Sequence, residues 1–153
     1  MTLTNNFTAT LTSAYDETAN LATVKASINS QINSRLALAD AFYSIDTAIA
    51  GGGSDTYDLV GSLVDHLNNA VTFAKVMLLF IRNKSDTAMT IGGAACIPLL
   101  NGSTDRITLP ALGSMWVHVE AGITVTATSA DKIIITGTAG KTYEMIVLGI
   151  APV

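Results

Sequence analysis

The stretch that decides the fold is Val71-Thr-Phe73-Ala-Lys-Val76-Met-Leu-Leu-Phe-Ile81. Its first half alternates apolar and polar side chains, as a half-buried β-strand does, and Val76–Ile81 is continuously apolar. A short, continuously apolar strand is typical of a position inside a sheet that is covered on both faces. We therefore expect this segment to form a central strand of the core.

Strand-like segments lie on both sides of this stretch, and turns with glycine or asparagine separate them. Most are short and alternate apolar with polar residues, which predicts β-strands. The segments are Phe42–Ile49, Tyr57–Val64, Ala88–Ile91, Arg106–Leu109, Met115–Glu120, Ile123–Thr128, Lys132–Ile135 and Tyr143–Leu148. A tight hairpin is expected at Asn101-Gly102. Because the strands do not alternate with helices, the sequence predicts an all-β fold, an antiparallel β-sandwich of the jelly-roll kind.

Residues 1–40 carry a weaker signal. Apolar residues alternate with threonines from Phe7 to Leu11, which predicts an edge strand or an extended arm. The segment Leu21–Ala39 also fits a helical stripe, but its threonine, serine and asparagine residues are poor helix formers. Extended structure is the expectation there, and a helix is the alternative. The predicted organisation is an extended N-terminal arm with edge strands over 1–40 and a sandwich domain over 41–153.

The composition favours assembly. The chain has 153 residues, a common size for one domain, with 49% hydrophobic and only 13% charged residues. Charged residues are about half as frequent as in an average protein, so part of the surface must be apolar or polar without charge. Such a surface is typical of subunits that bury part of it against copies of themselves or a larger lattice.

The charge and the single cysteine argue against several partners. A net charge of −4 is opposite to what a nucleic-acid-binding surface needs, so no nucleic acid is expected. The run Val76–Ile81 is far shorter than the roughly 20 residues of a membrane-spanning helix, so no membrane is expected either. Cys96 is the single cysteine and is expected to be an inert buried thiol. Since Met1–Phe7 does not resemble a secretory signal, we expect synthesis in a reducing cytoplasm.

One segment, Gly137-Thr-Ala-Gly140-Lys141-Thr142, imitates the end of a phosphate-binding loop. That loop requires a glycine where this chain has Ile135, and it requires a helix that starts at the lysine. Tyr143–Leu148 has instead the pattern of a strand. An ordinary hairpin turn is therefore expected here, and no nucleotide cofactor.

Other polar residues lack the spacing of a catalytic or metal site. His66 and His118 have no recognisable catalytic partners, and two histidines make a poor metal cage. Asp55, Asp58 and Asp65 lie near turns, but they lack the spacing of a calcium-binding loop and are better explained as turn carboxylates. We expect no enzyme, no metal and no cofactor.

Aromatic residues leave one alternative open. Tyr15, Tyr57, Trp116 and Tyr143 could stack on sugar rings, and sandwiches are common hosts of sugar-binding sites. Rings this sparse more often fill cores or interfaces. A carbohydrate-binding module is therefore kept as an alternative function.

Three segments resemble those of a family of tailed-phage virion proteins. Members of that family pair an Asp-Leu-x-Gly-x-Leu segment with Thr-Phe-x-x-Val/Ile strands, an Asn turn and a Val/Ile-Gly-Gly return. The matching segments here are Asp55-Thr-Tyr-Asp-Leu59-Val-Gly-Ser-Leu63, Val71–Asn83 and Met89-Thr-Ile-Gly-Gly93.

The resemblance covers most of the chain from about Phe42 onward. The later strands Asp131–Ile135 and Tyr143–Gly149 also match the family pattern. Pro110-Ala-Leu-Gly113 departs from the Pro-Gly-Gly turn that is common in the family.

The resemblance implies a non-enzymatic virion structural protein, a capsid cement or decoration protein. Such a protein would bind the major capsid protein lattice at the capsid surface, stabilise the head and form a homotrimer. A phage tail or head-fibre component is the alternative within the same resemblance. Because an extended arm could add a strand to a neighbour's sheet, Leu3, Phe7 and Leu11 are candidate interface residues. A strand within the same sandwich is the other interpretation of these three residues.

Overall fold

The part of the chain that the computed structural model describes, residues 39–65, 67–99 and 104–153, contains ten β-strands and no helix. The strands are β1 (Ala41–Ala48), β2 (Ser54–Asp58), β3 (Leu63–Val64), β4 (Ala70–Val71), β5 (Lys75–Asn83), β6 (Met89–Gly92), β7 (Arg106–Leu109), β8 (Ser114–Thr124), β9 (Lys132–Thr136) and β10 (Thr142–Ile150). The all-β prediction is confirmed.

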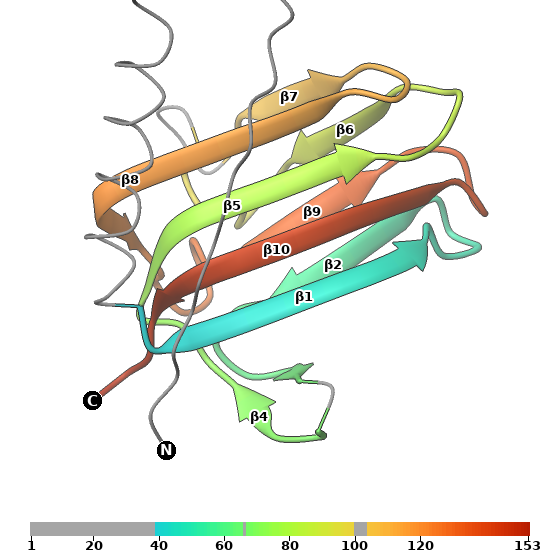
Figure 1. The fold of residues 1–153 in the computed structure, drawn as a ribbon. Helices are drawn as coiled ribbons and strands as arrows, with labels where there is room; N and C mark the ends of the chain where they lie inside the picture. The colour runs from blue at the N-terminus through green and yellow to red at the C-terminus, as the bar shows by residue number, and fades with distance from the viewer. Residues whose placement is uncertain (1–38, 66, 100–103) are drawn as a thin grey trace, which may run out of the picture. The chain divides into compact units, whose positions relative to one another are not determined.

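Eight of these strands form two antiparallel sheets that face each other (Figure 1). One sheet has the order β1-β10-β5-β8, and the other has the order β2-β9-β6-β7. The strands β3 and β4 form a separate small hairpin. Because the chain passes back and forth between the sheets in this order, the strands make the two Greek keys of a jelly roll. The predicted antiparallel, jelly-roll-like sandwich is therefore confirmed.

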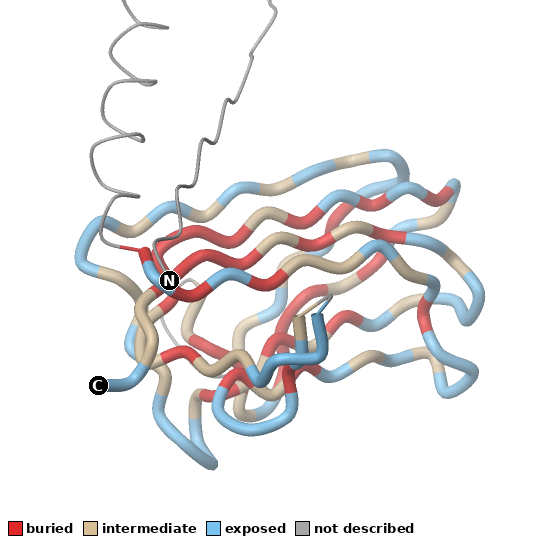
Figure 2. The backbone as a smooth tube through the Cα atoms, turned by 60° about the horizontal axis from the view of Figure 1, so that its bottom comes forward, coloured by how far each residue is buried: buried red, intermediate tan, exposed pale blue. Residues whose placement is uncertain are grey.

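The core lies between the two sheets, where alternate residues of each strand point inward. In β10 the inward residues Tyr143, Met145 and Val147 are fully buried, and in β9 so are Ile133 and Ile135. Figure 2 shows buried stretches along the central strands and exposed residues in the turns, and the edge strand β8 also carries exposed residues. Burying one such aliphatic side chain contributes about 1.5 to 3 kcal/mol, so this layer is the main source of stability.

The stretch Val71–Ile81 is not one strand, as the sequence had suggested. Val71 ends β4, and β5 begins at Lys75. Between them the buried Phe73 donates its backbone N–H to Leu59, and Ala74 donates to Ile150, so the chain changes partners at this point. From Lys75 onward the prediction holds, because β5 lies between β10 and β8 and is therefore central in its sheet.

The separate strand expected at Ile123–Thr128 is also not observed. The strand β8 continues to Thr124 with a register shift against β5 between His118 and Ile123, and Ile123 still pairs with Val76 of β5. Gly122 has a φ of 73°, a conformation that costs glycine little, and it lets the chain continue in place of a turn. The two predicted strands are therefore one long edge strand.

Contacts group Ala39–Val153 into one compact unit. The arm predicted over 1–40 lies outside the described residues up to position 38, and so does the hairpin predicted at Asn101-Gly102. No helix in the described ranges has the length and apolar character needed to cross a membrane.

Candidate assembly surface

The outward side of the β1-β10-β5-β8 sheet carries an apolar surface. The strand register places one outward residue of each strand in a row, and two neighbouring rows are mostly apolar. The first row is Phe42, Leu148, Leu78 and His118, and the second is Ser44, Ile146, Phe80 and Trp116. We call the six apolar members, Phe42, Leu78, Phe80, Trp116, Ile146 and Leu148, the outer sheet face.

The two ends of the outer sheet face are the most accessible. Phe42 on the edge strand β1 is 37% exposed, and Trp116 on the edge strand β8 is 46% exposed. The ring of Trp116 lies against Phe80, with a centroid distance of 4.5 Å and an angle of 49° between the planes. In the centre Leu78 and Leu148 are buried, although they lie on the side of the sheet away from the core cluster. Large apolar side chains at such outward positions are typical of a contact surface.

Two ion pairs lie beside the outer sheet face. In the third row Arg82 on β5 lies beside Glu144 on β10, with 3.7 Å between Nη1 and Oε1. Just beyond β5, Lys84 Nζ lies 2.7 Å from Asp46 Oδ2 on β1. Two cations therefore face two anions on this side of the sheet. A shallow depression of about 300 Å³ lies over the edge strand β1 and its neighbour β10, lined by Ser44, Asp46, Glu144 and Ile146 among others.

This surface was missed as a site by the sequence analysis, although its signal was present. The continuous apolar run Val76–Ile81 indicated a strand covered on both faces. The second sheet covers the inner side of β5, and its outer side carries the outer sheet face. The alternation in Met115–Glu120 was read correctly, because Trp116 and His118 both lie on the outer, more exposed side of β8.

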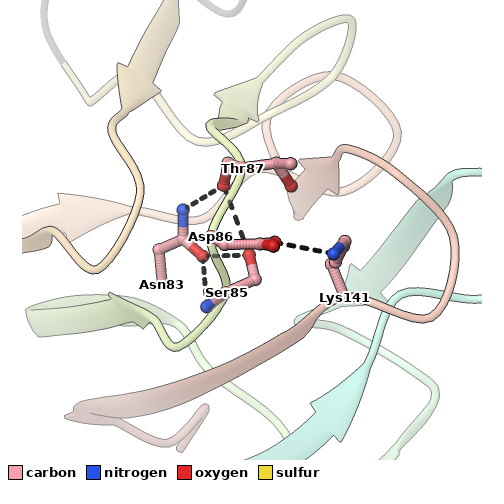
Figure 3. Close-up of polar contacts among 5 residues, drawn as sticks. All are labelled: Asn83, Ser85, Asp86, Thr87 and Lys141. Atoms are coloured by element: carbon pink, nitrogen blue, oxygen red, sulfur yellow. Dashed lines mark hydrogen bonds and ion pairs between the residues drawn. The ribbon is translucent and has the colours of Figure 1, made fainter.

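The segment that imitates a phosphate-binding loop is a hairpin turn. Tyr143 lies within the strand β10, so no helix starts at Lys141. Lys141 Nζ instead donates a hydrogen bond to Asp86 Oδ1 at 2.6 Å, across the gap between two turns (Figure 3). That bond, together with the positive charge of Lys141, lowers the pKa of the exposed Asp86 carboxyl.

Beside that ion pair, the buried Asn83 hydrogen-bonds to Ser85 and Thr87 of the β5–β6 turn (Figure 3), and it also binds the β7–β8 turn. Its Nδ2 donates to the carbonyl oxygens of Thr87 at 2.7 Å and Pro110 at 2.9 Å. Its Oδ1 accepts from the backbone N–H of Ser85 at 3.0 Å and from Ser85 Oγ at 2.5 Å. The amide therefore fixes the β5–β6 turn against the β7–β8 turn, which is a structural role.

The three aspartates considered for calcium each accept hydrogen bonds from groups of the protein itself. Asp58 accepts from the backbone N–H of Val60, and Asp65 accepts from that of Asn69. Asp55 accepts from the backbone of Ala50 and, at 2.7 Å, from the hydroxyl of Tyr143. Within 39–65, 67–99 and 104–153 no group of three or more His, Cys, Asp or Glu side chains is placed to hold a metal ion.

A tyrosine pair lies in the core behind Asp55. The hydroxyl groups of Tyr57 and Tyr143 are hydrogen-bonded to each other, and the ring of Tyr43 lies 6.0 Å from that of Tyr57. Burial raises the pKa of Tyr57 to about 12 and raises the pKa of Tyr143 further. Neutral phenols in this position pack within the core and bind each other.

Of the remaining candidate residues, Cys96 lies in the described part of the chain and five others lie outside it. Cys96 is buried, and burial raises the pKa of its thiol, which agrees with the expected inert cysteine. The other candidates, Leu3, Phe7, Leu11, Tyr15 and His66, lie outside the described residues, so the interface predicted at the first three stays a prediction.

Comparison with known proteins gives distant structural matches only. No family model and no curated protein matches the sequence. A subunit of the Bacillus endospore appendages, described as disulfide-linked pili, is 13% identical over 72% of this chain and 86% of its own, with a TM-score of 0.38. The Tobacco streak virus coat protein dimer is 11% identical over 74% of this chain and 90% of its own, with a TM-score of 0.35. Similarity at this level identifies no function, ligand or partner.

Proposed function

We propose that this chain is a non-enzymatic virion structural protein, a cement or decoration protein that binds the major capsid protein lattice and stabilises the head. The single observation that carries the proposal is the outer sheet face, because Phe42 and Trp116 expose large apolar surfaces on an ordered sheet. Burying such a surface against other subunits is favourable by about 25 cal/mol for each square ångström of apolar area.

The polar side chains of the sandwich fit this role. Asn83, Asp55 and Lys141 all make contacts that hold turns or strands together. A rigid sandwich of this kind suits a subunit that transmits force between neighbours. Each copy would need to bury on the order of 1,200 to 2,000 Å² in total against its neighbours, and many weak contacts on one lattice add up through effective concentration.

The location of the protein follows from the resemblance to tailed-phage virion proteins. The capsid surface is the proposed place, and the homotrimer implied by the same resemblance stays a prediction. A tail or head-fibre component is the alternative that shares the fold and the outer sheet face.

The test is the stability of virus particles with and without this protein. Particles that lack it should release their DNA at a lower temperature or a milder osmotic shock, and adding the purified chain should restore resistance. The matched variants are Trp116→Lys on the outer sheet face and Thr108→Lys on β7 of the other sheet, since both place one lysine at an exposed strand position. Only Trp116→Lys should fail to restore resistance. Equal resistance in particles with and without the protein would refute the proposal.

A carbohydrate-binding module is the second candidate, and the exposed ring of Trp116 is the observation that favours it. A glycan array distinguishes the two functions. A cement protein should give no glycan signal that Trp116→Ala removes, whereas a sugar-binding module should lose its signal in that variant.

A further inference from the structure

We propose that the β3–β4 hairpin is a second contact of this chain with the capsid lattice, in which Val60, Val64 and Leu67 bury their side chains against an apolar surface of a capsid subunit. We call these three residues the hairpin patch; they are 37%, 54% and 71% exposed. The inference rests on the proposed function, because it names an element that meets the lattice. It is argued from the exposure of the hairpin, the fixed shape of its turn and the residue types it carries.

The hairpin has one side toward the core and one side exposed. Leu63 on β3 is buried, and its pair Val71 on β4 packs against the core cluster. Because successive residues of a strand point to opposite sides, the next pair, Val64 and Ala70, points away from the core, and both residues are exposed. Leu67 follows in the connecting turn. The outward side of a small hairpin is usually polar, so apolar side chains gathered there indicate a contact surface.

Hydrogen bonds fix the turn that carries Leu67. Asp65 Oδ1 accepts from the backbone N–H groups of Leu67 and Asn69, each at 2.8 Å, and Asp65 Oδ2 accepts from Asn69 Nδ2 at 3.0 Å. Asn68 has a φ of 61°, which asparagine adopts more readily than most residues, and its N–H donates to the carbonyl oxygen of Asp65 at 3.0 Å. A turn that is already ordered loses little conformational freedom on binding, so Leu67 is presented as a preorganised anchor.

The base of the hairpin is tied to the sandwich. Leu59 and Phe73, which flank the hairpin, are fully buried. The N–H of Phe73 donates to the carbonyl oxygen of Leu59 at 2.8 Å, and the N–H of Leu59 donates to that of Asp131 at 2.7 Å. Figure 1 shows the hairpin standing apart from the two sheets. The hairpin patch therefore projects from the sandwich while its base is held there, as a contact that bears load requires.

The residue types favour a protein surface as the partner. From Val60 to Ala74 the sequence contains no Lys, Arg, Trp or Tyr, and Asp65 is its one acidic residue. A loop that enters a lipid surface usually carries basic residues or Trp and Tyr at the level of the head groups. A loop that binds nucleic acid needs cations for the phosphates. An apolar protein surface is the remaining class of partner that these side chains suit.

The small size of the hairpin patch favours a partner that is present in many copies. The patch has three residues, whereas each side of a standard interface contributes about 20 to 30. Such a contact is weak for a single molecule. It becomes effective where a first contact already holds the chain on a lattice, because the second contact then forms at a high effective concentration. The capsid lattice is therefore the proposed partner, in preference to a free second copy of this chain.

The test measures binding of the purified chain to virus particles that lack it. Leu67→Ser should weaken binding about tenfold, and Val64→Ser/Leu67→Ser about a hundredfold, because each change removes one aliphatic side chain from the contact. The matched control Leu112→Ser removes a leucine that is equally exposed, at 72%, from the β7–β8 turn and should leave binding unchanged. Circular dichroism and the melting temperature should match those of the natural chain in all three variants. Should the double variant lose its fold, Leu67→Ser alone decides.

A photoreactive phenylalanine derivative in place of Leu67 identifies the partner. It should cross-link to the major capsid protein on the same particles, and cross-links only to a second copy of this chain would overturn the proposal. If the natural chain binds the particles and the hairpin variants bind equally well, the proposed function stands and the hairpin contact fails. If the natural chain does not bind the particles at all, the proposed function fails and the hairpin contact fails with it.

Discussion

The ring of Trp116 packs on Phe80 from the neighbouring strand, on the side of the sheet that faces away from the core. Directly behind this pair, Leu79 and Val117 face the second sheet, with Leu79 fully buried and Val117 packed against the core. One pair of strands thus builds the core with one set of residues and an apolar outer face with the alternate set. This division explains how so small a domain can be stable and still expose large apolar side chains.

The first prediction follows from that division. Trp116→Ala should lower the free energy of unfolding only modestly, by about 0.5 to 1.5 kcal/mol for the lost aromatic pair, because the core side of β8 is untouched. Self-association should weaken much more than folding does. Urea unfolding and sedimentation of the same variant measure the two effects. A loss of stability with unchanged association would contradict this account.

The second prediction concerns Asn83, whose amide is fully buried and joins two turns. Asn83→Ala removes the partners of the Ser85 N–H and of the Thr87 and Pro110 carbonyl groups. Leaving one such group buried and unpaired costs about 1 to 3 kcal/mol. For Asn83→Ala we expect the free energy of unfolding, measured with denaturant, to fall by roughly 3 kcal/mol in total.

The neighbouring Asp86→Ala is the control for Asn83→Ala. It breaks the contact with Lys141, but Asp86 is exposed, so the unfolding free energy should change little. Equal effects of the two substitutions would show that the Asn83 contacts do not stabilise the fold.

The third prediction concerns Gly149, which lies where the register of β10 shifts against β5. A Cβ atom at this position would lie 2.0 Å from the carbonyl oxygen of Lys75 and 2.9 Å from the ring of Phe73. Gly149→Ala should therefore force the two strands apart and lower the melting temperature by many degrees.

Gly51→Ala serves as the comparison for Gly149→Ala, since a Cβ atom at Gly51 would meet no atom within 4 Å. Its melting temperature should stay close to that of the natural chain. A stable Gly149→Ala variant would show that the close approach of the two strands is not needed.

The fourth prediction concerns alkaline pH. The pKa of Tyr57 is raised to about 12 in the folded state, above the value of about 10 in an unfolded chain, and that of Tyr143 is raised as well. A raised pKa contributes stability that is complete below pH 10 and is lost as the pH rises toward 12, because the unfolded chain releases the proton first.

The unfolding free energy should therefore fall above pH 10, by up to about 1.4 kcal/mol per pH unit for each of these tyrosines. Tyr57→Phe should make the fall shallower, because one titrating group is gone. Lysines that titrate in the same pH range contribute equally to both slopes, so their contribution cancels when the natural chain and the variant are compared. Parallel slopes would mean that Tyr57 has an ordinary pKa in the folded protein.

Much of the fold could be predicted from the sequence, because period-two alternation is a local signal. β7 matches its predicted bounds, and β1, β9 and β10 begin or end within two residues of theirs. The break before Lys75 was not predictable in this way, since it depends on Leu59 and Ile150 accepting hydrogen bonds from Phe73 and Ala74. The continuation of β8 through Gly122 likewise depends on pairing with β5.

The candidate surface was only partly predictable for the same reason. The apolar run Val76–Ile81 indicated cover on both sides, but only the register shows that Phe80 lies between Trp116 and Ile146. The contact of Asp55 with Tyr143 joins residues 88 positions apart, so no local pattern could indicate it. Long-range pairing, which a single sequence does not display, separates the predicted from the unpredicted features.

The measurement that tests the central claim most directly is an electron cryomicroscopy map of the mature virus particle. We predict density for this jelly roll on the outer surface of the capsid shell, in contact with the major capsid protein. Particles whose capsid surface carries no such density, with the chain found only in the tail or only free of the particle, would contradict it.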